Sequence, residues 1–386
     1  MEIFASEKIL HRFPLYKKHS ASRRQSQVLS HYLWVRISRN QKRGLVVSQT
    51  KYRLHFIFKR ETLSFFVGNM TRQTANLGQT GIAVSALGIG TWAWGDKLFW
   101  NYGKEYGASQ VEEAFKAAVE AGITFFDTAE VYGLGESERL LGKFTQETDI
   151  PIDIASKFAP VPWRFGANAV HNAITESLNR LKTDKIALYQ VHWPFTFLIS
   201  QETLINALGE EVKRGRIGSV GVSNYSAEQM RQASQILAKK EVPLAVNQVQ
   251  YSLLYRKIET KGILATAKEL GVTILAYSPL AQGLLTGKYS PESQNLPDGA
   301  RKVDSRFKKE GLEKIAPILR VMQELGEKYQ KTPAQVALNW LIAQGDVIPI
   351  PGAKTAAQAI ENAGALGWSL EAQEVTQLEQ MSRPWL

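Results

Sequence analysis

The chain has 386 residues, of which 44% are hydrophobic, and this is enough for one large domain or two of ordinary size. It contains no cysteine, which excludes disulfide bonds, cysteine nucleophiles and thiolate metal sites. A net charge of +11 is typical of nucleic-acid-binding proteins, but what it implies depends on where the basic residues lie in the chain.

The positive charge is confined to the N-terminal segment. Residues 1–69 contain 14 Lys or Arg and 3 Asp or Glu, whereas residues 70–386 contain 33 of each kind. The larger part of the chain therefore lacks the charge pattern of a nucleic-acid-binding protein. No run of about 18 apolar residues occurs, so we expect no membrane-spanning helix.

Residues 1–69 show no helical or strand period, because basic pairs such as Arg23-Arg24 interrupt each apolar run. We expect an unstructured basic extension, followed by one folded domain over residues 70–386. Three interpretations of the extension stay open: an organelle transit peptide, a basic interaction arm, or sequence upstream of a true initiator at Met70. The expected location is cytoplasmic, with a plastid as the alternative if the segment is a transit peptide.

From residue 75 onward, apolar segments alternate with helical patterns. Residues 75–85 alternate in polarity around Gly78 and Gly81, which predicts a β-hairpin. Eight short apolar runs follow, each succeeded by a helical pattern, and this repeat predicts an α/β fold of the (β/α)8 TIM-barrel type. The expected strands are 86–89, 123–126, 152–156, 187–191, 219–222, 245–249, 272–276 and 347–350.

Reactive side chains stand at or just beyond the ends of three of these strands. Asp127 follows the second strand and Tyr132 comes five residues later, Lys157 follows the third strand, and His192 follows the fourth. In a barrel of parallel strands the carboxyl ends form the face where chemistry takes place. These four are the candidate catalytic residues, although each alone would also suit a structural ion pair, a surface tyrosine or a buried histidine.

The runs FFDTAEVYG, ASK, YQVHWP, GVSNYS and IPIPGAK occur in this order over about residues 76–382. They resemble those of the aldo-keto reductases. The run GIGTWAWGDKLFWNYG and the aromatic loops are most similar to a cyanobacterial and plant-chloroplast branch of that family. The resemblance implies an NADPH-dependent oxidoreductase that reduces an aldehyde or ketone, with a small carbonyl compound as its substrate.

The same resemblance gives the four catalytic candidates their roles. Tyr132 would donate the proton, and Lys157 would lower the pKa of that tyrosine. Asp127 would fix Lys157 in position. His192 would hydrogen-bond the substrate carbonyl.

The resemblance also assigns the cofactor site. No Gly-x-Gly-x-x-Gly fingerprint occurs, so a Rossmann site is not expected. Lys354 and Thr355 precede a helix and would suit the 2′-phosphate of NADPH, because helix starts favour anions. Many relatives carry an arginine where this chain has Gln358, which leaves Lys354 as the main charge. The expected cofactor contacts are Ser223, Asn224 and Gln248 at the carboxamide, Tyr277 on the ring, Ser278, Leu280 and Gly283 at the pyrophosphate, and Lys354, Thr355, Gln358, Glu361 and Asn362 at the adenosine end.

Five tryptophans fall in loops after the strands and are expected to line an apolar substrate pocket, although each could equally pack a loop. They are Trp92, Trp94, Trp100, Trp163 and Trp193. No metal is expected, since residues 70–386 contain two histidines and no cysteine. Two other functions stay open: an NADPH-binding sensor or regulatory subunit with vestigial activity, and a lyase or isomerase on the same barrel.

Overall fold

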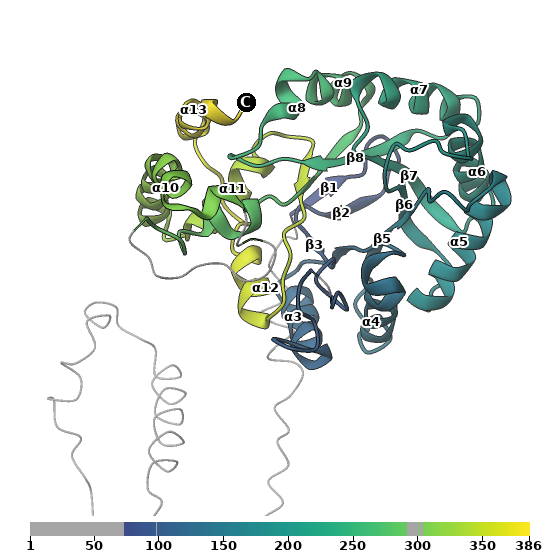
Figure 1. The fold of residues 1–386 in the computed structure, drawn as a ribbon, viewed down its shortest axis with the longest axis horizontal. Helices are drawn as coiled ribbons and strands as arrows, with labels where there is room; N and C mark the ends of the chain where they lie inside the picture. The colour runs from purple at the N-terminus through teal and green to yellow at the C-terminus, as the bar shows by residue number, and fades with distance from the viewer. Residues whose placement is uncertain (1–72, 98, 292–300, 302–303) are drawn as a thin grey trace, which may run out of the picture. The chain divides into compact units, whose positions relative to one another are not determined.

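The eight apolar segments form one parallel sheet in this computed structural model (Figure 1). The structure describes residues 73–97, 99–291, 301 and 304–386, so the expected extension over residues 1–69 lies outside the described part. In the sheet, each strand pairs with the next along the chain. The strands are β3 (Gly88–Gly90), β4 (Phe125–Asp127), β5 (Asp153–Phe158), β6 (Ile186–Val191), β7 (Ile217–Ser223), β8 (Leu244–Gln250), β9 (Thr273–Tyr277) and β10 (Val347–Pro349).

The sheet closes on itself between its first and last strands. The backbone N–H of Gly90 donates to the carbonyl of Pro351 at 3.0 Å, and Gly90 forms a parallel bridge with Gly352. The predicted (β/α)8 barrel is therefore confirmed, with strand limits that differ from the expected ones by a few residues.

Helices surround the barrel and bury its outer face. Apolar side chains that point into the barrel form a separate inner cluster, which includes Phe125, Leu188 and Leu275. Strands buried on both faces explain the nearly continuous apolar runs in the sequence. The α-helices are α3 (Ala108–Glu120), α4 (Glu136–Thr145), α5 (Gly166–Leu181), α6 (Gln201–Lys213), α7 (Ala227–Ala238), α8 (Lys257–Thr260), α9 (Ile263–Leu270), α10 (Lys309–Tyr329), α11 (Pro333–Ile342), α12 (Ala356–Ala363) and α13 (Ala372–Met381).

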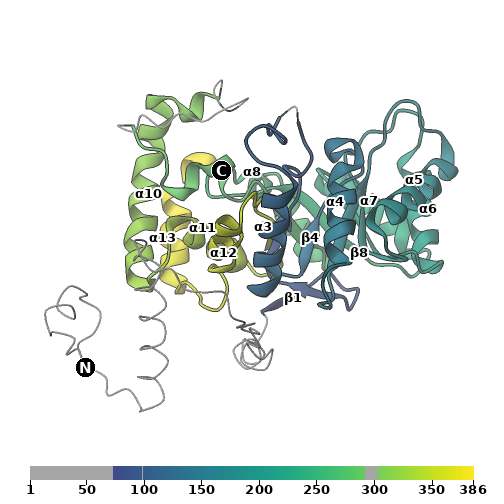
Figure 2. The same cartoon turned by 90° about the horizontal axis from the view of Figure 1, so that it is seen from below.

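The predicted hairpin covers the end of the barrel where the strands begin. It consists of β1 (Thr74–Asn76) and β2 (Ala83–Ser85), which pair in antiparallel fashion, and β1 lies at the lower edge of the barrel in Figure 2. The backbone N–H of Gly78 donates to the Thr273 hydroxyl at 3.0 Å. Gly78 has a φ of +54°, and a Cβ there would lie 2.6 Å from the Ala245 carbonyl oxygen, so the turn requires glycine. With this end covered, the opposite end is the accessible one.

Candidate active site

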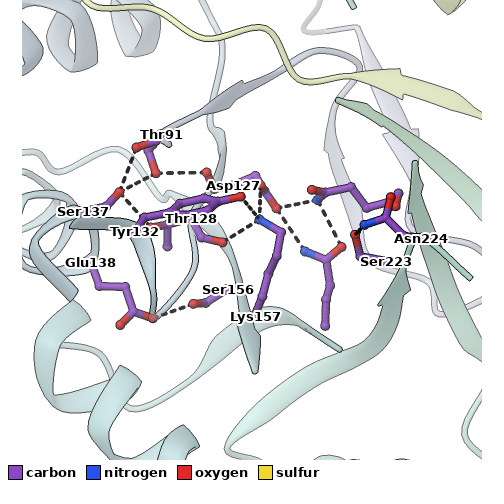
Figure 3. A network of polar contacts seen from close by, with 12 residues as sticks. Thr91, Asp127, Thr128, Tyr132, Ser137, Glu138, Ser156, Lys157, Ser223 and Asn224 are labelled. Atoms are coloured by element: carbon purple, nitrogen blue, oxygen red, sulfur yellow. Dashed lines mark hydrogen bonds and ion pairs between the residues drawn. The ribbon is translucent and has the colours of Figure 1, made fainter. Parts of the chain in front are cut away.

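A buried ion pair forms the centre of the site at the carboxyl ends of β4 and β5 (Figure 3). The Lys157 ammonium donates to Asp127 Oδ1 at 2.5 Å, to the Thr128 carbonyl at 2.8 Å and to the Tyr132 hydroxyl at 3.2 Å. Lys157 has no exposed surface and Asp127 is only 2% exposed. Buried charges are tolerated when they are paired and hydrogen-bonded, and here all three ammonium hydrogens have an acceptor.

The turn between Asp127 and Tyr132 is held by a cluster of hydroxyl groups. Thr128 Oγ1 donates to Ser137 Oγ at 2.9 Å, and Ser137 Oγ lies 3.0 Å from the Thr91 carbonyl (Figure 3). Tyr132 then begins a short 3-10 helix, η2 (Tyr132–Gly135). The structure thereby brings Tyr132 back over the end of the strand that carries Asp127.

The Tyr132 phenol keeps its proton more tightly than a free tyrosine does. Removal of the phenol from water raises its pKa, and although Lys157 lowers it, Asp127 raises it again, so the net shift is upward. Lys157 thus lowers the pKa of Tyr132 as expected, but desolvation and Asp127 outweigh this contribution. Burial alone would lower the pKa of Lys157, but Asp127 and Tyr132 raise it, so Lys157 stays cationic.

His192 follows β6 and lies at the edge of the Tyr132 ring. The two ring centroids are 5.6 Å apart, and the imidazole stacks on Trp193 at 3.9 Å. Burial, with a further contribution from Lys157, holds the pKa of His192 well below its usual value, so the imidazole is neutral. Its buried Nδ1 has no hydrogen-bond partner among the described residues. The structure thus brings the four catalytic candidates together in one place.

Gln190 is a further member of the site that the sequence argument did not single out. Its side-chain amide donates to Asp127 Oδ2 at 3.0 Å, and that of Gln248 donates to the same oxygen at 2.8 Å. The Gln248 amide also donates to Gln190 Oε1 at 3.2 Å. A signal was present in the sequence: Gln190 is a polar residue in a buried strand, two positions before His192 and thus on the same face.

Four of the expected cofactor residues meet at the ends of β7, β8 and β9. Ser223 Oγ donates to the Gln248 carbonyl at 3.0 Å, and the Asn224 amide donates to Ser223 Oγ at 3.1 Å. The Tyr277 hydroxyl donates to Asn224 Oδ1 at 3.1 Å. Asn224 has a φ of +62°, an unusual backbone conformation of the kind that concentrates at binding sites.

The segment after β9 also contains residues with positive φ values. Ser278, Ala281 and Gln282 have φ values of +50°, +47° and +59°, and Gly283 has a φ of +100°. The N–H groups of Ala281 and Gly283 donate to the carbonyls of Ser278 and Leu280, at 2.9 Å in both cases. Leu280, with a φ of −97°, directly precedes Ala281 in this segment. The contact of Ser278, Leu280 and Gly283 with a pyrophosphate stays a prediction.

Lys354 lies just before α12, and its ammonium packs on two aromatic rings of the loop after β3. Its ammonium lies 4.6 Å from the Trp100 ring centroid and 4.5 Å from that of Tyr106. Burial, together with the nearby positive charges of Arg301 and Lys288, lowers its pKa. Within the described residues no carboxylate forms an ion pair with it. A partly desolvated cation without a carboxylate fits a phosphate group.

Three of the remaining candidates for the adenosine end of the cofactor form hydrogen bonds at the start of α12 or just before it. Thr355 caps α12 by accepting from the Gln358 N–H at 3.3 Å, and Gln358 Oε1 accepts from the Lys354 N–H at 2.7 Å. Asn362 is buried and donates to the Gly352 carbonyl at 3.3 Å. Glu361 is partly exposed, and its contact with a cofactor stays a prediction.

The five tryptophans do not share one role. Trp94 has no exposed surface, donates to the Ala353 carbonyl at 2.8 Å and packs against Phe126 and Phe144, so its assignment to the substrate pocket is wrong. An apolar ring at this position is part of the core between barrel and helices. Trp100 and Trp193 are partly buried, and Trp100 packs on Lys354, whereas Trp92 and Trp163 are exposed. Trp92 is 39% exposed beside Tyr132, Trp193 stacks on His192, and Trp163 is 73% exposed.

The described residues contain neither a candidate metal site nor a candidate membrane-spanning helix. Over the described residues, no three or more His, Cys, Asp or Glu side chains gather where they could hold a metal ion. None of the helices in that part of the chain combines the length and the apolar character needed to cross a membrane.

Comparison with known proteins identifies the family. Residues 86–383 match the model of the aldo/keto reductase family. The chain belongs to this family. It is 40% identical over 314 residues to a pyridoxal reductase, chloroplastic, of Arabidopsis thaliana, and the match covers 78% of this chain and 84% of that protein. This relative agrees with the expected plant-chloroplast branch.

Solved structures in the family have the same fold. A glycerol dehydrogenase from Gluconobacter oxydans superposes with a TM-score of 0.70 at 29% identity, covering 81% of this chain and 95% of that chain. An aldo/keto reductase from Klebsiella pneumoniae in complex with NADP and acetate gives a TM-score of 0.62 at 30% identity, with coverage of 81% and 95%. Family membership makes the protein an oxidoreductase, as the sequence predicted.

Proposed function

We propose that the protein reduces an aldehyde or ketone to the alcohol with NADPH, and that Tyr132 supplies the proton. The observation that carries the proposal is the 3.2 Å contact between the Lys157 ammonium and the Tyr132 hydroxyl, made while Asp127 holds the same ammonium. General acid catalysis needs a protonated donor at the reacting oxygen. The neighbouring ammonium stabilises the phenolate that is left when the proton departs.

The protein is an NADP-dependent oxidoreductase, as its family membership indicates and as the NADP complex of the Klebsiella relative supports. When bound, NADPH supplies a hydride to the carbonyl carbon. The residues present fit this cofactor. Ser223, Asn224 and Gln248 would hold the carboxamide, while Lys354 and Thr355 would hold the 2′-phosphate and favour NADPH over NADH.

The other site residues would position the carbonyl group. His192 is neutral, and it would hydrogen-bond the substrate carbonyl through Nε2, since its Nδ1 is buried. Asp127 keeps Lys157 charged and in place. Because all four catalytic candidates stand together, an enzyme is favoured over the alternative of a sensor or regulatory subunit with vestigial activity.

The name of the Arabidopsis relative supports pyridoxal as the first aldehyde to test. Pyridoxal is a small carbonyl compound, in agreement with the expected substrate class. The same name, which includes the word chloroplastic, supports a plastid as the alternative to a cytoplasmic location.

Replacement of Tyr132 by phenylalanine tests the proton donor. Tyr132→Phe keeps the ring and removes the hydroxyl, so kcat should fall by about 10²–10⁴-fold while NADPH affinity, measured by fluorescence titration, is retained. Near-normal turnover would identify another donor.

The pH profile of the unaltered protein is the companion measurement. Reduction needs the protonated phenol, and the pKa of Tyr132 is raised above its ordinary value of 10.0. The rate should therefore be fully present at lower pH, hold between about pH 7 and 9, and be lost only as the pH rises through that raised pKa. A loss of rate with an apparent pKa near 8 would contradict the role of Tyr132.

A further inference from the structure

Glu130 is a buried carboxylate two residues before Tyr132, and its partners belong to the neighbouring strand end. Its Oε1 accepts from the Ala159 N–H at 2.6 Å. The Arg164 guanidinium donates to Oε1 at 2.5 Å and to Oε2 at 2.9 Å. A bidentate pair of this kind fixes the orientation of both side chains. Because Ala159 directly follows β5, Glu130 joins the turn that carries Tyr132 to the end of that strand.

Arg164 is itself fixed by the segment to which Glu130 binds. Its guanidinium donates to the Ala159 carbonyl at 3.0 Å and lies 4.7 Å from the centroid of the Phe158 ring. Glu130 therefore meets a backbone N–H and a guanidinium that both have defined places at the end of β5. A buried carboxylate keeps such partners, because separation of the pair would leave a charge with little access to water.

The same strand end carries the ammonium that contacts Tyr132. Lys157 precedes Ala159 by two residues and donates to the Tyr132 hydroxyl at 3.2 Å (Figure 3). One short segment, residues 157–164, thus supplies both the ammonium and the attachment of the turn. The distance between the phenol oxygen and Lys157 Nζ consequently depends on how firmly Glu130 is bound to that segment.

The backbone just after Tyr132 has an unfavourable conformation. Residues 133–135 have φ values of +56°, +58° and +85° in succession, and the middle one is Leu134. The left-handed region is unfavourable for a residue with a side chain, and this leucine is 89% exposed, so its own packing does not offset the strain. A strained segment keeps its shape only when surrounding contacts impose it. Arg139 donates to the Leu134 carbonyl at 3.1 Å on one side of Tyr132, and Glu130 is the attachment on the other.

We propose that Glu130 and Arg164 are positioning residues for the reduction: the pair holds the turn of Tyr132 on the end of β5, so that the phenol stays within hydrogen-bonding distance of Lys157. This rests on the proposed function, in which Tyr132 is the proton donor. The pair acts through the backbone of the turn. A shift of about 1 Å in a reacting group can cost about 10²-fold in rate, so a loosened turn slows proton transfer even when every catalytic side chain is present.

The variant Glu130→Gln tests the pair in the full-length protein with NADPH and pyridoxal. The amide keeps one oxygen for the Ala159 N–H, but it loses the charge and the second acceptor that Arg164 uses. We expect kcat to fall by about 10-fold to 100-fold while the Kd of NADPH changes by less than about twofold. Arg164→Met should act in the same direction. The double variant should be no worse than the more impaired single variant, because both changes break one contact.

Glu211 offers a matched control, because it is a buried carboxylate held by arginines at the opposite end of the barrel. It accepts from Arg214 at 2.9 Å and from Arg216, which directly precedes β7. Glu211→Gln should lower the melting temperature, as Glu130→Gln does, but leave kcat unchanged. An equal loss of kcat in both variants, or an unchanged kcat in Glu130→Gln, would overturn the proposal.

Hydrogen exchange measures the attachment of the turn without any catalysis. In Glu130→Gln the amides of Ala159 and of residues 130–135 should exchange about tenfold faster, whereas in Glu211→Gln they should exchange as in the unaltered protein. Faster exchange with an unchanged kcat would overturn the proposal, because the turn would then be loose without effect on Tyr132. If the unaltered protein reduces no aldehyde, the proposed function fails, and unchanged exchange rates in Glu130→Gln would overturn the attachment as well.

Discussion

Asp127 is the residue at which the proton-donor group and the cofactor group of side chains meet. Its Oδ1 accepts from Lys157, and its Oδ2 accepts from the amides of Gln190 and Gln248. Both amide hydrogens of Gln248 are used, one on Asp127 and one on Gln190 Oε1, so only its oxygen remains for another group. Gln190 therefore fixes which end of the Gln248 amide faces the expected nicotinamide site.

Replacement of Gln190 by leucine should disturb that orientation. Gln190→Leu removes one acceptor from Gln248 and one donor from Asp127, and a hydrogen bond is worth about 1 kcal/mol, or fivefold in affinity. NADPH binding should weaken by about that factor, whereas a fragment without nicotinamide, 2′-phospho-ADP-ribose, should bind as before. Fluorescence or calorimetric titration measures both.

The exposed Gln232 on α7 offers the control, because its amide contacts only Glu228 among the described residues. Gln232→Leu should change neither affinity. Equal weakening of NADPH and of the fragment in Gln190→Leu would show a general structural defect instead of a role at the nicotinamide.

At the scale of elements, α4 and α5 approach so closely that one position requires glycine. A Cβ at Gly142 would lie 2.4 Å from the Arg180 carbonyl oxygen and 2.7 Å from the Cα of Leu181. The contact matters for the site because α4 also carries Glu138, which accepts from Ser156 Oγ at 2.5 Å, next to Lys157. The packing of two outer helices thus supports the strand that holds the ammonium.

Gly142→Ala should consequently destabilise the fold. Overpacking against backbone atoms costs about 1–3 kcal/mol, which denaturant unfolding measures directly. Gly107→Ala is the control, since nothing lies within 3.8 Å of a Cβ there, and a poorer helix N-cap should cost less than about 1 kcal/mol. A loss of stability no greater than that of the control would mean that the helices can shift apart at little cost.

The elements were predicted more completely than the contacts between them. Parallel strands that are buried on both faces leave nearly continuous apolar runs in the sequence, and the ends of these runs place Asp127, Lys157 and His192 on one face of the barrel without further information. Trp94 shows one limit of sequence-based prediction. The sequence does not distinguish a loop tryptophan that lines a pocket from one that belongs to the core, and its packing against Phe126 places Trp94 in the core. The pKa of Tyr132 shows a second limit. Its largest cause is desolvation, which depends on all the surrounding atoms, whereas the sequence motif reveals only the charged neighbour Lys157.

At the scale of the whole molecule, the barrel is closed by its own strands, and residues 70–386 carry no net charge. The hairpin of β1 and β2 covers the end where the strands begin, and the bridge between Gly90 and Gly352 joins the first strand to the last. Residues 70–386 carry 33 basic and 33 acidic side chains, whereas the excess charge of +11 belongs to residues 1–69. We propose that residues 70–386 are the complete catalytic domain.

A chain that begins at Met70 should therefore keep the melting temperature, the NADPH affinity and the turnover of the full-length protein. Ordering the backbone costs about 1–2 kcal/mol per residue, and a segment whose apolar runs are broken by basic pairs has little apolar surface to offset that cost. Thermal unfolding, cofactor titration and aldehyde reduction, each measured on both chains at the same ionic strength, make the comparison. A shorter chain that melts several degrees lower, or that binds NADPH more weakly, would show that residues 1–69 are part of the folded domain.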